Sequence, residues 1–118
     1  MLGAAARRGA GQQDRFSAVR LLAAEHASEP FPDCRGEEID GVDLVLVDAD
    51  LHGCVLHFLG GLTGLDAWQR DILERVSGDL DRVQQKLPPA CVTYFQQAQA
   101  LANALLAALN GDGVGVRG

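Results

Sequence analysis

The chain has 118 residues, of which 47% are hydrophobic and 22% charged, and its formal net charge is −6. This length and composition predict one soluble globular domain rather than a disordered chain, and charged residues interrupt every apolar run before it reaches the roughly 18 residues of a membrane span. An acidic protein repels phosphate backbones, so nucleic acid is not an expected partner.

The three cysteines, Cys34, Cys54 and Cys91, are widely spaced and form no CxxC pair. Their odd number and spacing predict reduced, largely buried thiols rather than a disulfide framework or a zinc module. The N-terminal residues are small and basic but lack the apolar centre of a secretion signal, so a cytoplasmic location is expected. Nine arginines against one lysine are typical of a GC-rich bacterial genome.

Both ends of the chain are rich in glycine or alanine and show no apolar period. They predict a disordered N-terminal tail at 1–12 and a flexible C-terminal tail at 111–118, around a helical domain at 13–110. The first predicted helix spans about 14–28, with Phe16, Val19, Leu22 and His26 along one stripe. Pro30 and Pro32 end it, because proline removes a backbone donor and disfavours helix in the residue before it.

The stretch LVLVDADLHGC, residues 44–54, admits two interpretations. As a strand followed by Asp-x-Asp, it resembles the first motif of haloacid-dehalogenase-type phosphatases, although Leu51-His52 stands where that family usually has Gly-Thr. The resemblance implies that Asp48 attacks a phosphoryl group and Asp50 serves as acid and base, with magnesium held by a later acidic pair. However, two long helical patterns and no further strand follow residue 62, so no parallel sheet can hold the nucleophile.

The helical interpretation of this region, spanning about 42–59, is therefore favoured. At 100° per residue Asp48 and Asp50 diverge, whereas Asp48 and His52 lie one turn apart. Two apolar arcs flank this pair, which predicts a central helix: the first comprises Leu44, Val47, Leu51, Cys54, Val55 and Phe58, and the second Val45, Ala49 and Leu56. The pair could be a polar contact, the lining of a pocket or part of a metal site. Nothing is spaced to supply further ligands, so no metal or cofactor is expected.

Two more helices complete the pattern. Apolar residues at spacings of three and four predict a helix at about 65–87, with the stripe Leu65, Trp68, Ile72, Val76, Leu80, Val83 and Leu87. Pro88-Pro89 ends it, and a fourth helix runs to about Leu109, where Asn110-Gly111 closes it. Its predicted buried side comprises Cys91, Tyr94, Phe95, Ala98, Leu101, Ala102, Leu105 and Leu109.

We therefore expect an all-α, single-domain, four-helix bundle-like array. The functional hypothesis is a non-enzymatic protein-binding module, such as an adaptor or a toxin-neutralising immunity-like protein, with Asp48, His52, Asp71 and Glu74 as binding residues. Asp71 and Glu74 belong to the acidic outer side of the third helix, which could steer a partner with a basic surface toward it. The alternative is a small metal-dependent hydrolase or phosphatase that uses Asp48, Asp50 and His52.

Overall fold

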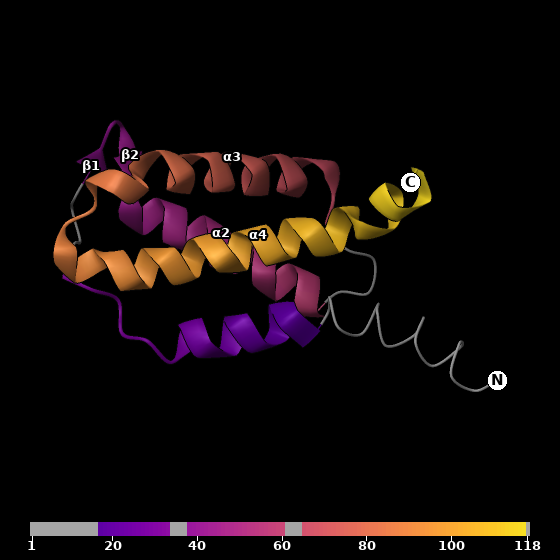
Figure 1. Ribbon diagram of the computed structural model, residues 1–118, viewed down its shortest axis with the longest axis horizontal. Coiled ribbons are helices and arrows are strands. Elements are labelled where there is room, and N and C mark those ends of the chain that lie inside the picture. The colour runs from indigo at the N-terminus through magenta and orange to yellow at the C-terminus, as the bar shows by residue number, and fades with distance from the viewer. Residues whose placement is uncertain (1–16, 34–37, 61–64, 118) are drawn as a thin grey trace.

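Four helices and one short hairpin make up the part of the chain that the structure describes (Figure 1). The computed structural model describes residues 17–33, 38–60 and 65–117, with side chains up to residue 110. A first helix occupies 17–27, followed by β1 (Glu38–Ile39), β2 (Val42–Asp43), α2 (Leu44–Gly60), α3 (Ala67–Val83), the 3₁₀ turn η1 (Gln84–Lys86) and α4 (Pro89–Arg117). The predicted all-α fold is confirmed, and the predicted tail at 1–12 lies outside the described residues. No helix in the described ranges is long and apolar enough to cross a membrane.

The hairpin before α2 was not predicted. β1 and β2 pair antiparallel, with Ile39 opposite Val42, and both turn residues, Asp40 and Gly41, have positive φ angles of 53° and 79°. Asp-Gly is the preferred sequence for a two-residue turn of this kind, so the signal was present in the sequence. Lys86 binds the Asp40 carboxylate at 2.6 Å, which ties the hairpin tip to η1.

The predicted helix at 42–59 is confirmed, except that its first two residues form β2. Oδ1 of Asp43 accepts hydrogen bonds from the backbone N–H groups of Val45 (3.0 Å) and Leu46 (3.2 Å). This side-chain cap satisfies donors that the first turn of a helix leaves without partners. The chain therefore changes from strand to helix at Asp43.

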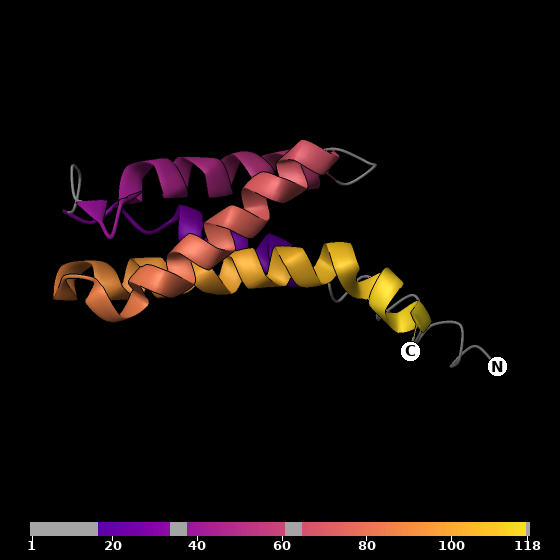
Figure 2. The same ribbon diagram turned by 90° about the horizontal axis from the view of Figure 1, so that it is seen from above.

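The core is arranged around α4. Figure 1 shows α4 running between the first helix and α3, and Figure 2 shows α3 crossing obliquely from α2 to α4. The predicted hairpin of the third and fourth helices is thus present, joined through η1. The prediction that the second helix is central is wrong, because its second apolar arc faces solvent: Val45 is 39% exposed and Leu56 70%. The most deeply buried large side chains are Leu44, Leu51, Leu73, Leu80, Phe95, Leu101 and Leu105.

Two further details correct the sequence-based assignment. Trp68 was placed on the buried stripe of the third helix but is 62% exposed, and Leu73 takes the buried position. The residues of α3 that face the core follow the row Leu73, Val76, Leu80 and Val83, from which Trp68 is displaced. In addition, α4 continues through Asn110-Gly111 to Arg117. Glycine costs a helix only about 1 kcal/mol, and no proline follows to stop it.

Most of the predicted buried side of α4 is confirmed, since Cys91, Tyr94, Phe95, Ala98, Leu101, Ala102 and Leu105 are all buried and Leu109 is half-buried. Cys54 and Cys91 are free, buried thiols, as expected. Cys34 lies outside the described residues.

Candidate functional site

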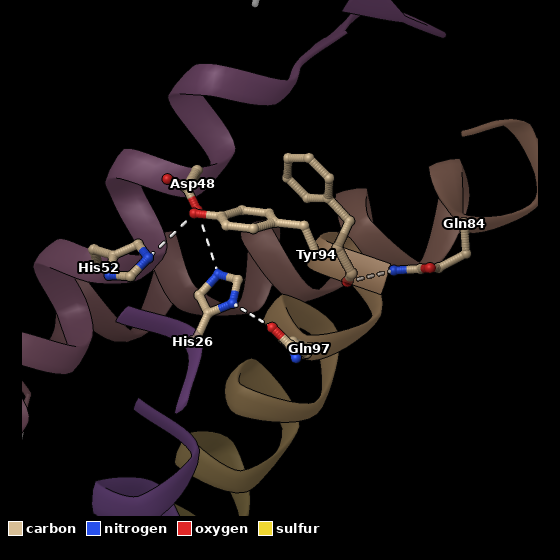
Figure 3. A network of polar contacts seen from close by, with 7 residues as sticks. His26, Asp48, His52, Gln84, Tyr94 and Gln97 are labelled. Carbon is tan, nitrogen blue, oxygen red and sulfur yellow. Dashed lines mark hydrogen bonds and ion pairs between the residues drawn. The ribbon is translucent and has the colours of Figure 1, made fainter. Parts of the chain in front are cut away.

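A cluster of polar side chains fills the space where the first helix, α2 and α4 meet. Its centre is Oδ1 of Asp48 on α2, and Figure 3 shows His26, His52 and Tyr94 around this carboxylate. His52 Nε2 lies 3.4 Å from Oδ1, His26 Nε2 lies 3.6 Å from it, and the Tyr94 hydroxyl donates a hydrogen bond to it at 2.8 Å. The predicted pairing of Asp48 with His52 is therefore present, and two residues from other helices complete it.

Three aromatic contacts hold the rings of this cluster in place. The His26 and His52 rings stack with centroids 5.2 Å apart and planes inclined by 12°. The His26 and Tyr94 centroids are 4.1 Å apart, and Phe31 meets the edge of Tyr94 at 5.2 Å. Because each ring is restrained by another, the nitrogen and oxygen atoms around Asp48 have defined positions.

His26 is the most deeply placed member of the cluster. The first helix buries Val19 and, two turns later, His26, whose side chain has no exposure to solvent. Its Nδ1 lies 3.3 Å from Oε1 of Gln97 on α4 (Figure 3), while Nε2 has no hydrogen-bond partner within the described chain. The sequence placed His26 on the apolar stripe but did not connect it with Asp48, because the two residues belong to different helices.

The cluster favours a negative Asp48 and a positive His52. Burial by itself raises the pKa of Asp48, but contacts with His26, His52 and Tyr94 and the charge of His52 outweigh burial and hold this pKa well below its ordinary value of 3.8. The contact with Asp48 raises the pKa of His52 above its ordinary value of 6.5, against the opposing effect of burial. Asp48 is 17% exposed and His52 32%, so the cluster reaches solvent on the His52 side.

The helix separates Asp48 from Asp50, as the favoured interpretation predicted. Asp50 points to another side of α2, where its carboxylate lies 3.7 Å from the Arg75 guanidinium of α3. The two aspartates therefore do not emerge side by side, as the phosphatase motif requires. The phosphatase resemblance also requires a strand ahead of Asp48, and this stretch is helical.

A second feature is the outer side of α2, which is apolar although it faces solvent. We call it the α2 docking face: Val45, Leu46, Ala49, Gly53 and Leu56 of α2, with Trp68 of α3. All six residues are exposed, and Leu46, Leu56 and Trp68 have exposed fractions of 59%, 70% and 62%. A hollow of about 230 Å³ lies between Trp68 and the small residues Ala49 and Gly53.

The predicted binding residues of α3, Asp71 and Glu74, are both exposed. They lie away from the Asp48 cluster, so the four predicted binding residues do not form one site. Burial raises the pKa of the Cys54 thiol, and the nearby charge of Asp50 raises it further. Cys54 is therefore a poor nucleophile, because the thiolate is the reactive form.

Comparison with protein-family models, with curated proteins and with solved structures finds no match for this chain. Any functional conclusion therefore depends on the geometry of the cluster and of the docking face.

Proposed function

We propose that the protein is a protein-binding module of the regulatory or adaptor type, and that the α2 docking face is its binding surface. One observation carries the proposal: α2 is apolar on its buried side and also on its solvent side. A surface helix normally presents charged and polar residues to water. Contiguous exposed apolar side chains are typical of a surface that another molecule covers.

The shape of the docking face suits an anchoring side chain. The small residues Ala49 and Gly53 lie between larger apolar residues at each end of the helix face, and a Cβ atom added to Gly53 would meet nothing within 4 Å. The hollow beside them has Trp68 as one wall. Binding energy in protein interfaces concentrates where an aromatic or aliphatic side chain fills such a desolvated pocket.

The charges beside the docking face indicate the chemistry of the partner. A second hollow, of about 290 Å³, adjoins Leu46 and is lined by one cation, Arg75, and by the acids Glu38, Asp43, Asp50 and Asp79. Residues 21–118 contain fifteen acidic and six basic residues, a net charge of −9. The partner that fits is an amphipathic helix whose apolar side covers the docking face and whose flanks are basic.

The same charge argument disfavours nucleic acid, whose phosphates the acidic body would repel. The free thiols of Cys54 and Cys91 suit a reducing compartment, so we extend the proposal to a cytoplasmic location.

The proposal can be tested with a fluorescently labelled peptide in which leucines at helical spacing form one face and lysines the other. We expect the full-length protein to bind it, as measured by fluorescence anisotropy, and Leu56→Asp to weaken binding by about tenfold or more. Leu21→Asp is the matched control, because Leu21 is also an exposed leucine (60%) but lies on the first helix. A peptide of the same composition in scrambled order controls for simple charge attraction.

If Leu56→Asp and Leu21→Asp bind the peptide equally well, the α2 docking face is not the binding surface. Sedimentation analysis tests whether a second copy of this chain occupies the docking face instead. If the wild type dimerises and Leu56→Asp is monomeric, the face joins two copies of the chain, and the proposal of a basic partner is wrong.

A further inference from the structure

We propose that His26, Asp48 and His52 bind one divalent transition-metal ion of the zinc type. This inference is independent of the docking face. Asp48 and His52 project from another side of α2, where His26 of the first helix meets them (Figure 3). The ligand atoms are Nε2 of His26, Oδ1 of Asp48 and Nε2 of His52.

The spacing of these atoms agrees with metal coordination. Two ligands that each lie about 2.0–2.1 Å from a tetrahedral zinc ion are about 3.4 Å apart. The observed separations are 3.4 Å from Asp48 to His52 and 3.6 Å from Asp48 to His26. All three ligand atoms lie within 4.8 Å of one another, so small side-chain rotations bring them around one ion.

The buried nitrogen of His26 is the strongest evidence that the cluster holds a cation. Gln97 Oε1 accepts hydrogen bonds, so the His26 tautomer that satisfies this contact has its proton on Nδ1. In that tautomer the lone pair of Nε2 faces Oδ1 of Asp48, 3.6 Å away, which also carries lone pairs. The buried Nε2 and the partly exposed Oδ1 then face one another without a proton between them, and Nε2 has no other partner in the described chain. A cation between the two atoms satisfies both.

The residues around the ligands form the outer shell that metal sites use. A ligating histidine typically donates its second ring N–H to an oxygen atom. Oε1 of Gln97 lies 3.3 Å from Nδ1 of His26, in position to accept such a bond. A ligating carboxylate is typically hydrogen-bonded as well, and the Tyr94 hydroxyl donates to Asp48. Both contacts come from α4, so the helix that organises the core also orients the ligands.

The chemical types of the three ligand atoms indicate which class of metal ion the site would bind. Two imidazole nitrogens and one carboxylate oxygen suit zinc and its transition-metal neighbours, whereas calcium and magnesium require mostly oxygen ligands. Because His26 is fully buried and His52 is 32% exposed, the ion would enter on the His52 side. Three protein ligands leave the fourth position to water.

The test uses the full-length protein after treatment with a chelator, titrated with zinc chloride in a calorimeter. We expect one ion per chain. His52→Gln should weaken binding by more than about 100-fold, because even the loss of an outer-shell partner costs about 10–100-fold. His57→Gln is the matched control, since His57 lies on the same helix but is exposed and outside the cluster. Circular dichroism verifies that both variants remain helical.

A second measurement needs no variant. In nitrogen-15 NMR spectra of the histidine rings, zinc should shift the Nε2 signals of His26 and His52 and leave the ring of His57 unchanged. The proposal is wrong if the wild type binds no stoichiometric zinc, if His57→Gln weakens binding as much as His52→Gln, or if the Nε2 signals do not respond.

Discussion

At the residue scale, Asp48 is the point where sequence and structure can be compared most directly. The helical spacing of Asp48 and His52 predicted their contact, and it is observed at 3.4 Å. His26 stood on a predicted apolar stripe, which is an unusual place for an imidazole. Tyr94 was predicted only as a buried residue, and Gln97 was not singled out. A helix pattern shows which residues share a face but not which faces of different helices meet.

The contact between Asp48 and His52 makes a prediction about pH, stated for the metal-free protein. The pKa of His52 is raised on folding, so the contact stabilises the fold fully below the ordinary pKa of 6.5, and this contribution is lost as the pH rises through the folded value. The pKa of Asp48 is lowered on folding, so its contribution is present above 3.8 and is lost in stronger acid. The pair is therefore most stabilising between these two values.

His52→Gln should accordingly reduce the free energy of unfolding by about 0.5–1 kcal/mol near pH 5.5, a modest cost because the pair is partly exposed. The cost should shrink toward pH 9. Urea denaturation with a chelator present measures both values. The groups facing His52 are Asp48 on its own helix and the ring of His26 from the first helix. A cost that stays constant from pH 5.5 to 9 would contradict an ion pair.

At the element scale, α2 shows why periodicity outweighs local strand preference. Its valines favour a strand, but only β1 pairs with β2 in the described chain, and Asp43 caps the helix that follows. The sequence could not show whether the rest of the chain covers each of the two apolar arcs of α2. The sequence pattern of an apolar arc is the same whether the chain itself or another molecule buries it. Only the packing of α2 against α3 and α4 shows which arc the chain buries.

Substitutions at two helical glycines, Gly53 and Gly78, distinguish an effect on helix stability from an effect on partner binding. A Cβ atom at Gly53 or Gly78 would meet nothing within 4 Å, so alanine fits at both positions. Each substitution should raise the free energy of unfolding by about 0.5–1 kcal/mol, because alanine restricts the unfolded chain. Chemical denaturation measures this effect.

The two variants should differ in peptide binding. Gly53→Ala adds a methyl group to the hollow beside Trp68 and should weaken binding of the leucine–lysine peptide. Gly78→Ala on α3 lies outside that hollow and should leave binding unchanged. Identical affinities for both variants would show that the hollow does not receive an anchor.

At the scale of the whole molecule, the apolar spacing predicted the helical architecture well. The regular apolar spacing gave four helices in the correct order, and the prolines at 88–89 marked the reversal between α3 and α4. The spacing could not predict the angle at which α3 crosses its neighbours. Because α3 crosses obliquely from α2 to α4 (Figure 2), its first turns lie beside the outer face of α2, and Trp68 is exposed there instead of buried.

The acidic charge of the molecule supports the last prediction. Reversing Asp71 and Glu74 to lysine changes the formal net charge from −6 to −2, since each reversal adds two positive charges. Association with the leucine–lysine peptide should become slower and less dependent on salt, because long-range attraction sets the encounter rate. The melting temperature should hardly change, since both side chains are exposed and surface substitutions usually alter stability by less than about 0.5 kcal/mol.

Stopped-flow fluorescence at several salt concentrations measures these rates. The nearby cations Arg70 and Arg75 partly offset the negative charge on the surface of α3. The measured rates therefore distinguish a surface that steers the partner from ordinary solubilising charge. If association is unchanged in the double variant, α3 does not steer the partner. The acids beside Leu46, Asp43 and Asp50, would then be the next positions to reverse, and because Asp50 pairs with Arg75, the Asp43→Lys variant gives the cleaner comparison.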